Sequence, residues 1–155
     1  MTVNVTAEAA VEPTEDEKKV ERVLTRIFPT GRIERRTNQG TTIGLVVRGN
    51  GLDFLATLRN LIRQERIRTT ARAIFLRNAT DQILRIYLNK QAAFMGRVSF
   101  CAPVGESPHG PVSIKIESGE GEMQAVIDYL AAVPLSDPGV DARRRQRRSL
   151  SPEEE

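Results

Sequence analysis

The chain has 155 residues, of which 39% are hydrophobic and 5% aromatic, and this composition suits one domain with an aliphatic core. Its single cysteine and single histidine exclude an internal disulfide and a zinc site built from a cluster of histidines and cysteines. No apolar run approaches the roughly 18 residues of a membrane-spanning helix, and the first residues lack the pattern of a signal peptide, so we expect a cytoplasmic protein.

The net charge of +3 is distributed unevenly along the chain. Residues 48–97 contain ten basic and three acidic side chains, a net charge of +7, whereas residues 98–135 carry a net charge of −4. Nine of the ten basic residues in this middle segment are arginines. Because the planar guanidinium group matches the geometry of phosphate, the segment indicates an anionic partner, although ion pairing within the protein explains the same composition equally well.

The first predicted element is a half-buried strand over residues 3–11, where apolar and polar residues alternate. The sequence TEDE at residues 14–17 then has the pattern of a capping box, and we expect Thr14 to be the N-cap of a helix. Apolar residues recur at helical spacing from there to Phe28, and Pro29 ends the helix.

The remaining elements alternate between the two periodicities. Strands are expected over residues 32–37, 43–47, 84–88, 98–100 and 112–116. Helices are expected over residues 52–66, from Thr69 or Thr70 onward, over 90–95 and over 123–130. We therefore predict an α+β fold, a mainly antiparallel sheet of about five to six strands with helices packed on one face.

Arginines form a stripe on the helix predicted over residues 52–66. Arg59, Arg63 and Arg66 are spaced i, i+4 and i+7, which places them on one side of the helix beside its apolar face. Arg68 and Arg72 follow within the next predicted helix. These five side chains are candidate contacts for phosphate groups.

Glu65 is the one acid expected on the apolar face of the same helix. A carboxylate buried there needs a partner, and Arg66, Arg68 and Arg72 are close enough in sequence to supply one. We favour a structural ion pair over a catalytic role for this carboxylate.

A short helix predicted inside the stretch "YLNKQAAFMGRVSF" interrupts two strands. Asn89 is a good N-cap, so the helix begins at Lys90, and its first amides offer a site for an anion. Lys90, Gln91 and Arg97 would add charge and hydrogen bonds to such a site. The alternative is a compact joint of the fold, which explains Asn89 and the small residues but accounts less well for Lys90 and Arg97.

No catalytic or cofactor motif is found in the sequence. His109 lies in a turn-rich loop, which is a poor position for a rigid general base, and we expect Cys101 to be a partly buried, inert thiol. No glycine-rich phosphate-binding loop follows a strand. The sequence therefore predicts no catalytic residues, no metal site, no cofactor and no enzyme activity.

The composition changes after Pro134. Residues 136–155 contain few side chains that could bury apolar surface, so we predict a disordered, charged C-terminal tail after a folded domain of residues 1–135.

Three stretches of the sequence, "PTEDEKKVERVLTRIFP", "LRNLIRQERIRTTARAIF" and above all "YLNKQAAFMGRVSF", resemble the archaeal uncharacterised protein family 0201. The resemblance covers roughly residues 3–135. It implies RNA binding, and a fold similar to a double-stranded-RNA-binding domain elaborated toward the ribosomal protein that binds five-S RNA. It carries no enzymatic activity with it.

The sequence thus predicts a non-catalytic protein that contacts the phosphates of structured or double-stranded RNA, ribosomal RNA included, through its arginine-rich middle segment. The predicted contacts are Arg59, Arg63, Arg66, Arg68, Arg72, Asn89, Lys90, Gln91 and Arg97. The alternative is an interaction or scaffold module, in which the basic segment of one subunit meets the acidic segment of another in a homodimer. The two hypotheses differ in whether the basic side chains are accessible or lie against acids such as Glu120 and Glu122.

Overall fold

The computed structural model describes residues 1–102 and 110–132. One five-stranded sheet has the strand order β2-β3-β1-β5-β4, and every neighbouring pair is antiparallel. The strands are β1 (Val3–Ala10), β2 (Arg32–Asn38), β3 (Thr41–Asn50), β4 (Ile83–Asn89) and β5 (Pro111–Ser118). The helices are α1 (Glu17–Ile27), α2 (Ala56–Gln64), α3 (Arg68–Asn78), α4 (Lys90–Phe94) and α5 (Met123–Leu130), and a 3-10 turn, η1 (Leu52–Leu55), precedes α2.

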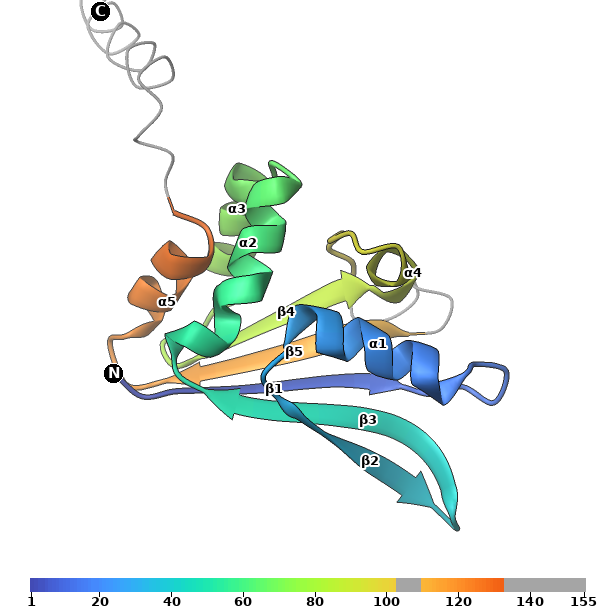
Figure 1. Cartoon of the computed structure of the whole chain (residues 1–155). Coiled ribbons are helices and arrows are strands. Elements are labelled where there is room, and N and C mark those ends of the chain that lie inside the picture. Colours follow the sequence, from blue (N-terminus) through green and yellow to red (C-terminus); the bar gives the residue numbers. More distant parts are fainter. Residues whose placement is uncertain (103–109, 133–155) are drawn as a thin grey trace, which may run out of the picture.

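The helices of the described chain lie on one face of the sheet (Figure 1). Every second residue of β1 from Val3 to Ala9 is buried, whereas Asn4, Thr6 and Glu8 point to the other face and keep part of their surface in solvent. Because alternate residues of a strand face opposite sides, this pattern puts the apolar row of β1 under the helices. The core continues into α1 through Val20, Val23, Leu24 and Ile27. The predicted α+β fold is confirmed.

The N-cap of α1 is Asp16 and not Thr14, so the predicted capping residue is wrong. The Asp16 carboxylate accepts a hydrogen bond of 2.9 Å from the backbone amide of Lys18. Thr14 lies inside a turn closed by the bond from Glu15 N to Glu12 O, and this turn delays the helix by two residues. Aspartate caps a helix as well as threonine does, so sequence pattern alone does not separate the two positions.

The strand predicted over residues 98–100 does not form. The chain returns beside the end of β4 through a single bridge between Leu88 and Phe100, flanked by backbone bonds from Asn89 N to Ser99 O and from Cys101 N to Tyr87 O. The pairing involves the last residues of β4, Tyr87, Leu88 and Asn89, just before α4 begins. The described sheet therefore has five strands.

The corner between α2 and α3 also differs from prediction. Helix α3 starts at Arg68 without a side-chain cap, so neither Thr69 nor Thr70 is the N-cap. The end of α2 is closed by backbone bonds from Arg66 N to Arg63 O and from Ile67 N to Ile62 O, and Arg66 takes a left-handed conformation with φ of 59°. This is the bonding pattern of a Schellman motif, which ends one helix and turns the chain directly into the next.

Within the described part of the chain, no helix is long and apolar enough to cross a membrane. The segment 103–109 with His109, and the predicted tail at residues 136–155, lie outside the described residues.

Candidate nucleic-acid interface

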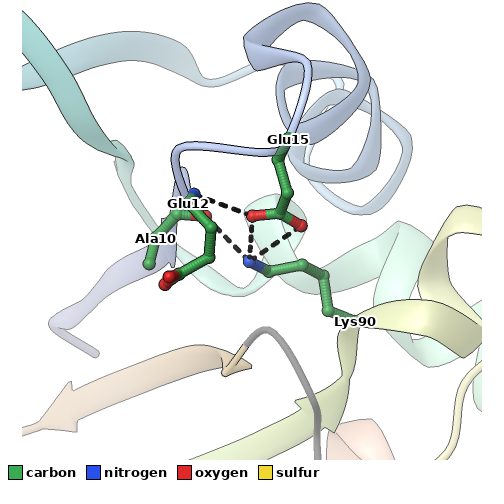
Figure 2. A network of polar contacts seen from close by, with 4 residues as sticks. All are labelled: Ala10, Glu12, Glu15 and Lys90. Carbon is green, nitrogen blue, oxygen red and sulfur yellow. Dashed lines mark hydrogen bonds and ion pairs between the residues drawn. The ribbon is translucent and has the colours of Figure 1, made fainter.

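Lys90 is buried, and this corrects its predicted role as a phosphate contact. Its ammonium group donates to Ala10 O at 2.8 Å and to both oxygens of Glu15, at 3.1 and 3.5 Å (Figure 2). The side chain of Lys90 is 0% exposed and that of Glu15 is 8% exposed. A lysine is rarely buried without a paired charge, and here Glu15, itself held by Glu12 N, supplies that charge. Lys90 fastens α4 to the turn before α1.

Asn89 and Gln91 have different roles on either side of Lys90. The side chain of Asn89 accepts a hydrogen bond of 3.0 Å from Ala92 N, which confirms it as the N-cap of α4. Its side-chain oxygen is therefore engaged within the fold. Gln91 is exposed and remains accessible.

Arg59 and Arg72 pack against α5. Arg72 donates to Asp128 Oδ1 at 2.7 Å and to Ala131 O at 3.0 Å. The hydrogen bond from Arg72 lowers the pKa of the Asp128 carboxyl below its ordinary value. The guanidinium of Arg59 lies 4.5 Å from the centroid of the Tyr129 ring, a cation–π geometry, and its Nε is buried without a hydrogen bond among the described residues. These two arginines join α2 and α3 to α5.

Glu65 forms the ion pair that its burial requires, although with a partner that sequence proximity did not suggest. Its carboxylate is 3.2 Å from Nη2 of Arg97, while the Arg97 side chain remains 69% exposed. The expected partners Arg66, Arg68 and Arg72 do not pair with it. The predicted structural ion pair at this corner is thus present, and it connects the end of α2 to the turn that follows α4.

Arg63, Arg66 and Arg68 remain as the accessible members of the predicted set. Arg63 and Arg66 are exposed and Arg68 is partly exposed. None of the three forms an ion pair with a described residue. We call Arg63, Arg66 and Arg68, together with the partly neutralised Arg97, the corner surface.

Sequence reasoning missed a second group of cations on α1. Lys19, Arg22 and Arg26 line a groove whose opposite side is α4, with Gln91 among its lining residues. Their spacing of three and four residues was visible in the sequence and indicates a single helix face. These three cations were not among the predicted contacts, because residues 1–47 carry no net charge overall and the prediction rested on the segment with a net charge of +7.

Two further features of the described residues concern metal-binding side chains and the single cysteine. No group of three or more histidine, cysteine, aspartate or glutamate side chains gathers there to hold a metal ion. Cys101 is partly buried, as predicted.

The fold and the accessible arginines define a small α+β protein with basic helical surfaces on the helix-covered side of an antiparallel sheet. A family model described as RNA binding matches residues 4–118. The UPF0201 protein of Sulfurisphaera tokodaii is 35% identical over 133 residues, which cover 86% of this chain and 88% of the relative. That of Aeropyrum pernix is 35% identical over 143 residues, covering 92% and 93%. The chain belongs to the archaeal UPF0201 family.

Solved structures of this family share the fold. The crystal structure of the UPF0201 protein from Methanococcus jannaschii aligns with a TM-score of 0.73 at 28% identity, covering 84% of this chain and 93% of that one. Another UPF0201 crystal structure aligns with a TM-score of 0.71, also at 28% identity. The family resemblance stated from the sequence is therefore confirmed, and the α+β fold is shared with these relatives.

Proposed function

We propose that this protein is a non-catalytic RNA-binding protein whose corner surface contacts the phosphates of structured RNA. The match to a family model described as RNA binding supports the class of partner. Guanidinium groups on rigid helix ends suit the phosphates and 2′-hydroxyls that double-stranded RNA presents. The contacts in this proposal are Arg63, Arg66, Arg68 and Arg97, and Gln91 is a further accessible hydrogen-bonding group of the predicted set.

The observation that carries the proposal is the backbone conformation of Arg66. Its φ of 59° falls in the left-handed region, at the helix-ending position where glycine is the preferred residue. A side chain other than glycine costs roughly 1 kcal/mol in this conformation. The backbone bonds that close α2 need this conformation, which glycine would adopt without the cost. The Arg66 side chain is exposed and forms no ion pair with a described residue, so the side chain itself adds no ion pair that offsets the cost. Strain retained in an unpaired, exposed arginine indicates a role outside the folded chain.

The homodimer hypothesis loses part of its basis in this structure. The acidic segment already meets the basic one within a single chain, through the pair formed by Arg72 and Asp128. Glu122, one of the acids named for an intersubunit contact, instead accepts from Gly119 N at 3.0 Å and from Thr2 N at 3.3 Å. Fewer complementary charges are left for a second subunit.

The test is the double variant Arg63→Gln/Arg66→Gly, measured by filter binding to a short RNA duplex over a range of salt concentrations. We expect weaker binding and a salt dependence that is shallower by about one unit for each lost phosphate contact. Removal of the left-handed arginine should at the same time leave the thermal midpoint unchanged or raise it. Weaker RNA binding in a protein that is no less stable is an outcome that a purely structural role cannot produce.

The matched control is Arg32→Gln/Arg77→Gln, which removes the same charge from two exposed arginines outside the corner surface. Equal losses in both variants would show nonspecific attraction by net charge. Unchanged RNA affinity in Arg63→Gln/Arg66→Gly would refute the corner surface as the binding site.

A further inference from the structure

A groove of about 430 Å³ lies between α1 and α4. Its lining residues are Lys19, Arg22, Val23, Arg26, Gln91 and Phe94. Three of these side chains are cations, one is an amide, and none is a carboxylate. The lining of the groove itself therefore carries positive charge and no negative charge.

The three cations are held close together by the geometry of α1. Residues three and four apart on a helix are neighbours on one face, so Lys19, Arg22 and Arg26 form a row along the groove. All three are exposed, and none forms an ion pair with a described residue. Like charges at this spacing repel, and an anion bound between them would relieve the repulsion.

Arg26 is oriented by α4. Its Nη1 donates to Ala93 O at 3.4 Å and to Phe94 O at 3.3 Å, which are carbonyl groups at the end of that helix. Gly96 makes this approach possible, because a Cβ on Gly96 would lie 3.0 Å from Arg26 Nη1. Only Nη1 is used in these contacts. The Nε and Nη2 groups, which together form the edge that binds phosphate through two parallel bonds, are left for a ligand.

The rest of the lining suits a nucleotide backbone better than a bare ion. Val23 and Phe94 provide apolar surface beside the cations, and Gln91 offers both a hydrogen-bond donor and an acceptor. Two acids, Glu15 and Asp16, line an adjoining hollow of about 240 Å³. Both are engaged, Glu15 by Lys90 and Asp16 by the amide of Lys18. Their negative charge disfavours an anion at the N-terminal end of the groove. The end near Arg22 and Arg26 is therefore the more favourable position for an anion.

We propose that this groove is a second phosphate-binding site, in which Arg22 and Arg26 bind a phosphate of the RNA backbone. Lys19 adds charge, and Gln91 hydrogen-bonds to the adjoining ribose, whose 2′-hydroxyl both donates and accepts. This inference rests on the proposed RNA-binding function.

The groove and the corner surface meet at the turn after α4. Arg26 binds the carbonyl of Phe94 on one side of the turn, and Arg97 binds Glu65 on the other. An RNA backbone that crosses this turn would reach both surfaces, so a single RNA molecule would bind the groove and the corner surface together.

The test compares Lys19→Gln/Arg22→Gln with a control, Lys18→Gln/Arg32→Gln, which removes one lysine and one arginine from exposed positions outside the groove. Arg26 is left intact because it also fastens α4. Binding of a fluorescent RNA duplex is followed by anisotropy across a salt series, and circular dichroism verifies equal thermal midpoints. We expect a loss of roughly tenfold in affinity and a salt slope shallower by one to two units for the groove variant, with a change of less than about twofold for the control.

Three outcomes separate the two proposals. If the unmodified protein fails to bind RNA duplexes, both the proposed function and the groove site are refuted. If the unmodified protein binds and the corner variant is weakened while the groove variant matches its control, only the groove site is refuted. If the groove variant is weakened beyond its control with an unchanged thermal midpoint, the groove is a phosphate-binding site.

Discussion

At the scale of single residues, Lys90 shows how one side chain can support two opposite interpretations. Its position at the start of a helix, beside Asn89 and Gln91, is typical of an anion site. In the structure its side chain turns inward, because Ala10 O and the Glu15 carboxylate accept hydrogen bonds from its ammonium group there. Both acceptors are more than seventy positions away in the sequence. No local pattern could have indicated them.

Replacing Lys90 with methionine should strongly destabilise the protein. Methionine fills the space of the lysine stem but leaves Ala10 O without its donor and Glu15 as a buried carboxylate without a counter-charge. Removing one partner of a buried ion pair costs about 3–5 kcal/mol, which urea denaturation would measure directly. Lys18→Met is the control, because Lys18 is exposed and its loss should stay within about 0.5 kcal/mol.

A loss of less than about 1 kcal/mol in Lys90→Met would mean that water already reaches the ammonium group. Lys90 would then be available to an external anion, and its removal from the set of RNA contacts would be wrong.

At the scale of elements, α5 is bound to α2 and α3 by contacts between the basic and acidic segments. Arg72 reaches Asp128 and the carbonyl of Ala131 at the end of α5, and Arg59 lies over the Tyr129 ring. The arginines of residues 48–97 therefore have at least two roles. Some of them join helices, and others, at the corner surface, remain accessible.

The ion pair between Arg72 of α3 and Asp128 of α5 predicts that the stability of the protein depends weakly on pH. Arg72 lowers the pKa of Asp128 from its ordinary value of 3.8, so the folded protein holds this carboxylate ionised more readily than the unfolded chain does. The stabilisation is present in full above about pH 4 and is lost as the pH falls through the lowered pKa. Because the Asp128 side chain is 52% exposed, solvent screening keeps the effect small.

The measurement is urea denaturation of the unmodified protein and of Asp128→Asn between neutral pH and pH 3. The asparagine retains an acceptor for Arg72 but not the charge. We expect a difference in unfolding free energy that is constant at neutral pH and shrinks toward zero under acid conditions. Glu120→Gln, at an exposed acid, is the control. A difference that persists unchanged at low pH would show that the charge of Asp128 contributes nothing.

Helices and strands were predictable wherever a periodic pattern of apolar residues extended over several residues. The contacts between these elements were not predictable from the sequence. The alternation in β1 and the helical spacing in α1 identified both elements, and Asn89 identified the start of α4. The strand expected over residues 98–100 is reduced to a single bridge at Phe100 beside the end of β4. Of the candidate site, Arg63 lies on an accessible side of α2, whereas Arg66 is exposed but lies beyond the end of that helix and not in its stripe. The contacts of Arg59, Arg72 and Lys90 were not predicted, because their partners come from distant segments.

At the scale of the whole molecule, the net charge conceals where cations are accessible. Residues 1–47 carry no net charge, yet α1 presents three cations and no carboxylate to one groove. Glu17 pairs with Arg35 of β2 at 2.7 Å. The distribution of charge over surfaces, and not over segments, decides where an anionic partner can bind.

The last prediction concerns the extent of the folded domain. The buried core of the described residues extends from Val3 to Ala131, and the composition of residues 136–155 offers few apolar side chains to add to it. A chain that ends after Leu135 should therefore keep its thermal midpoint within about 3 °C of the full-length value, because removing residues that bury little surface changes stability little. Differential scanning calorimetry of the two chains provides the comparison. A decrease of about 10 °C or more would show that the C-terminal residues pack against the domain, since a shift of that size corresponds to a few kcal/mol of lost stability in a protein of this length.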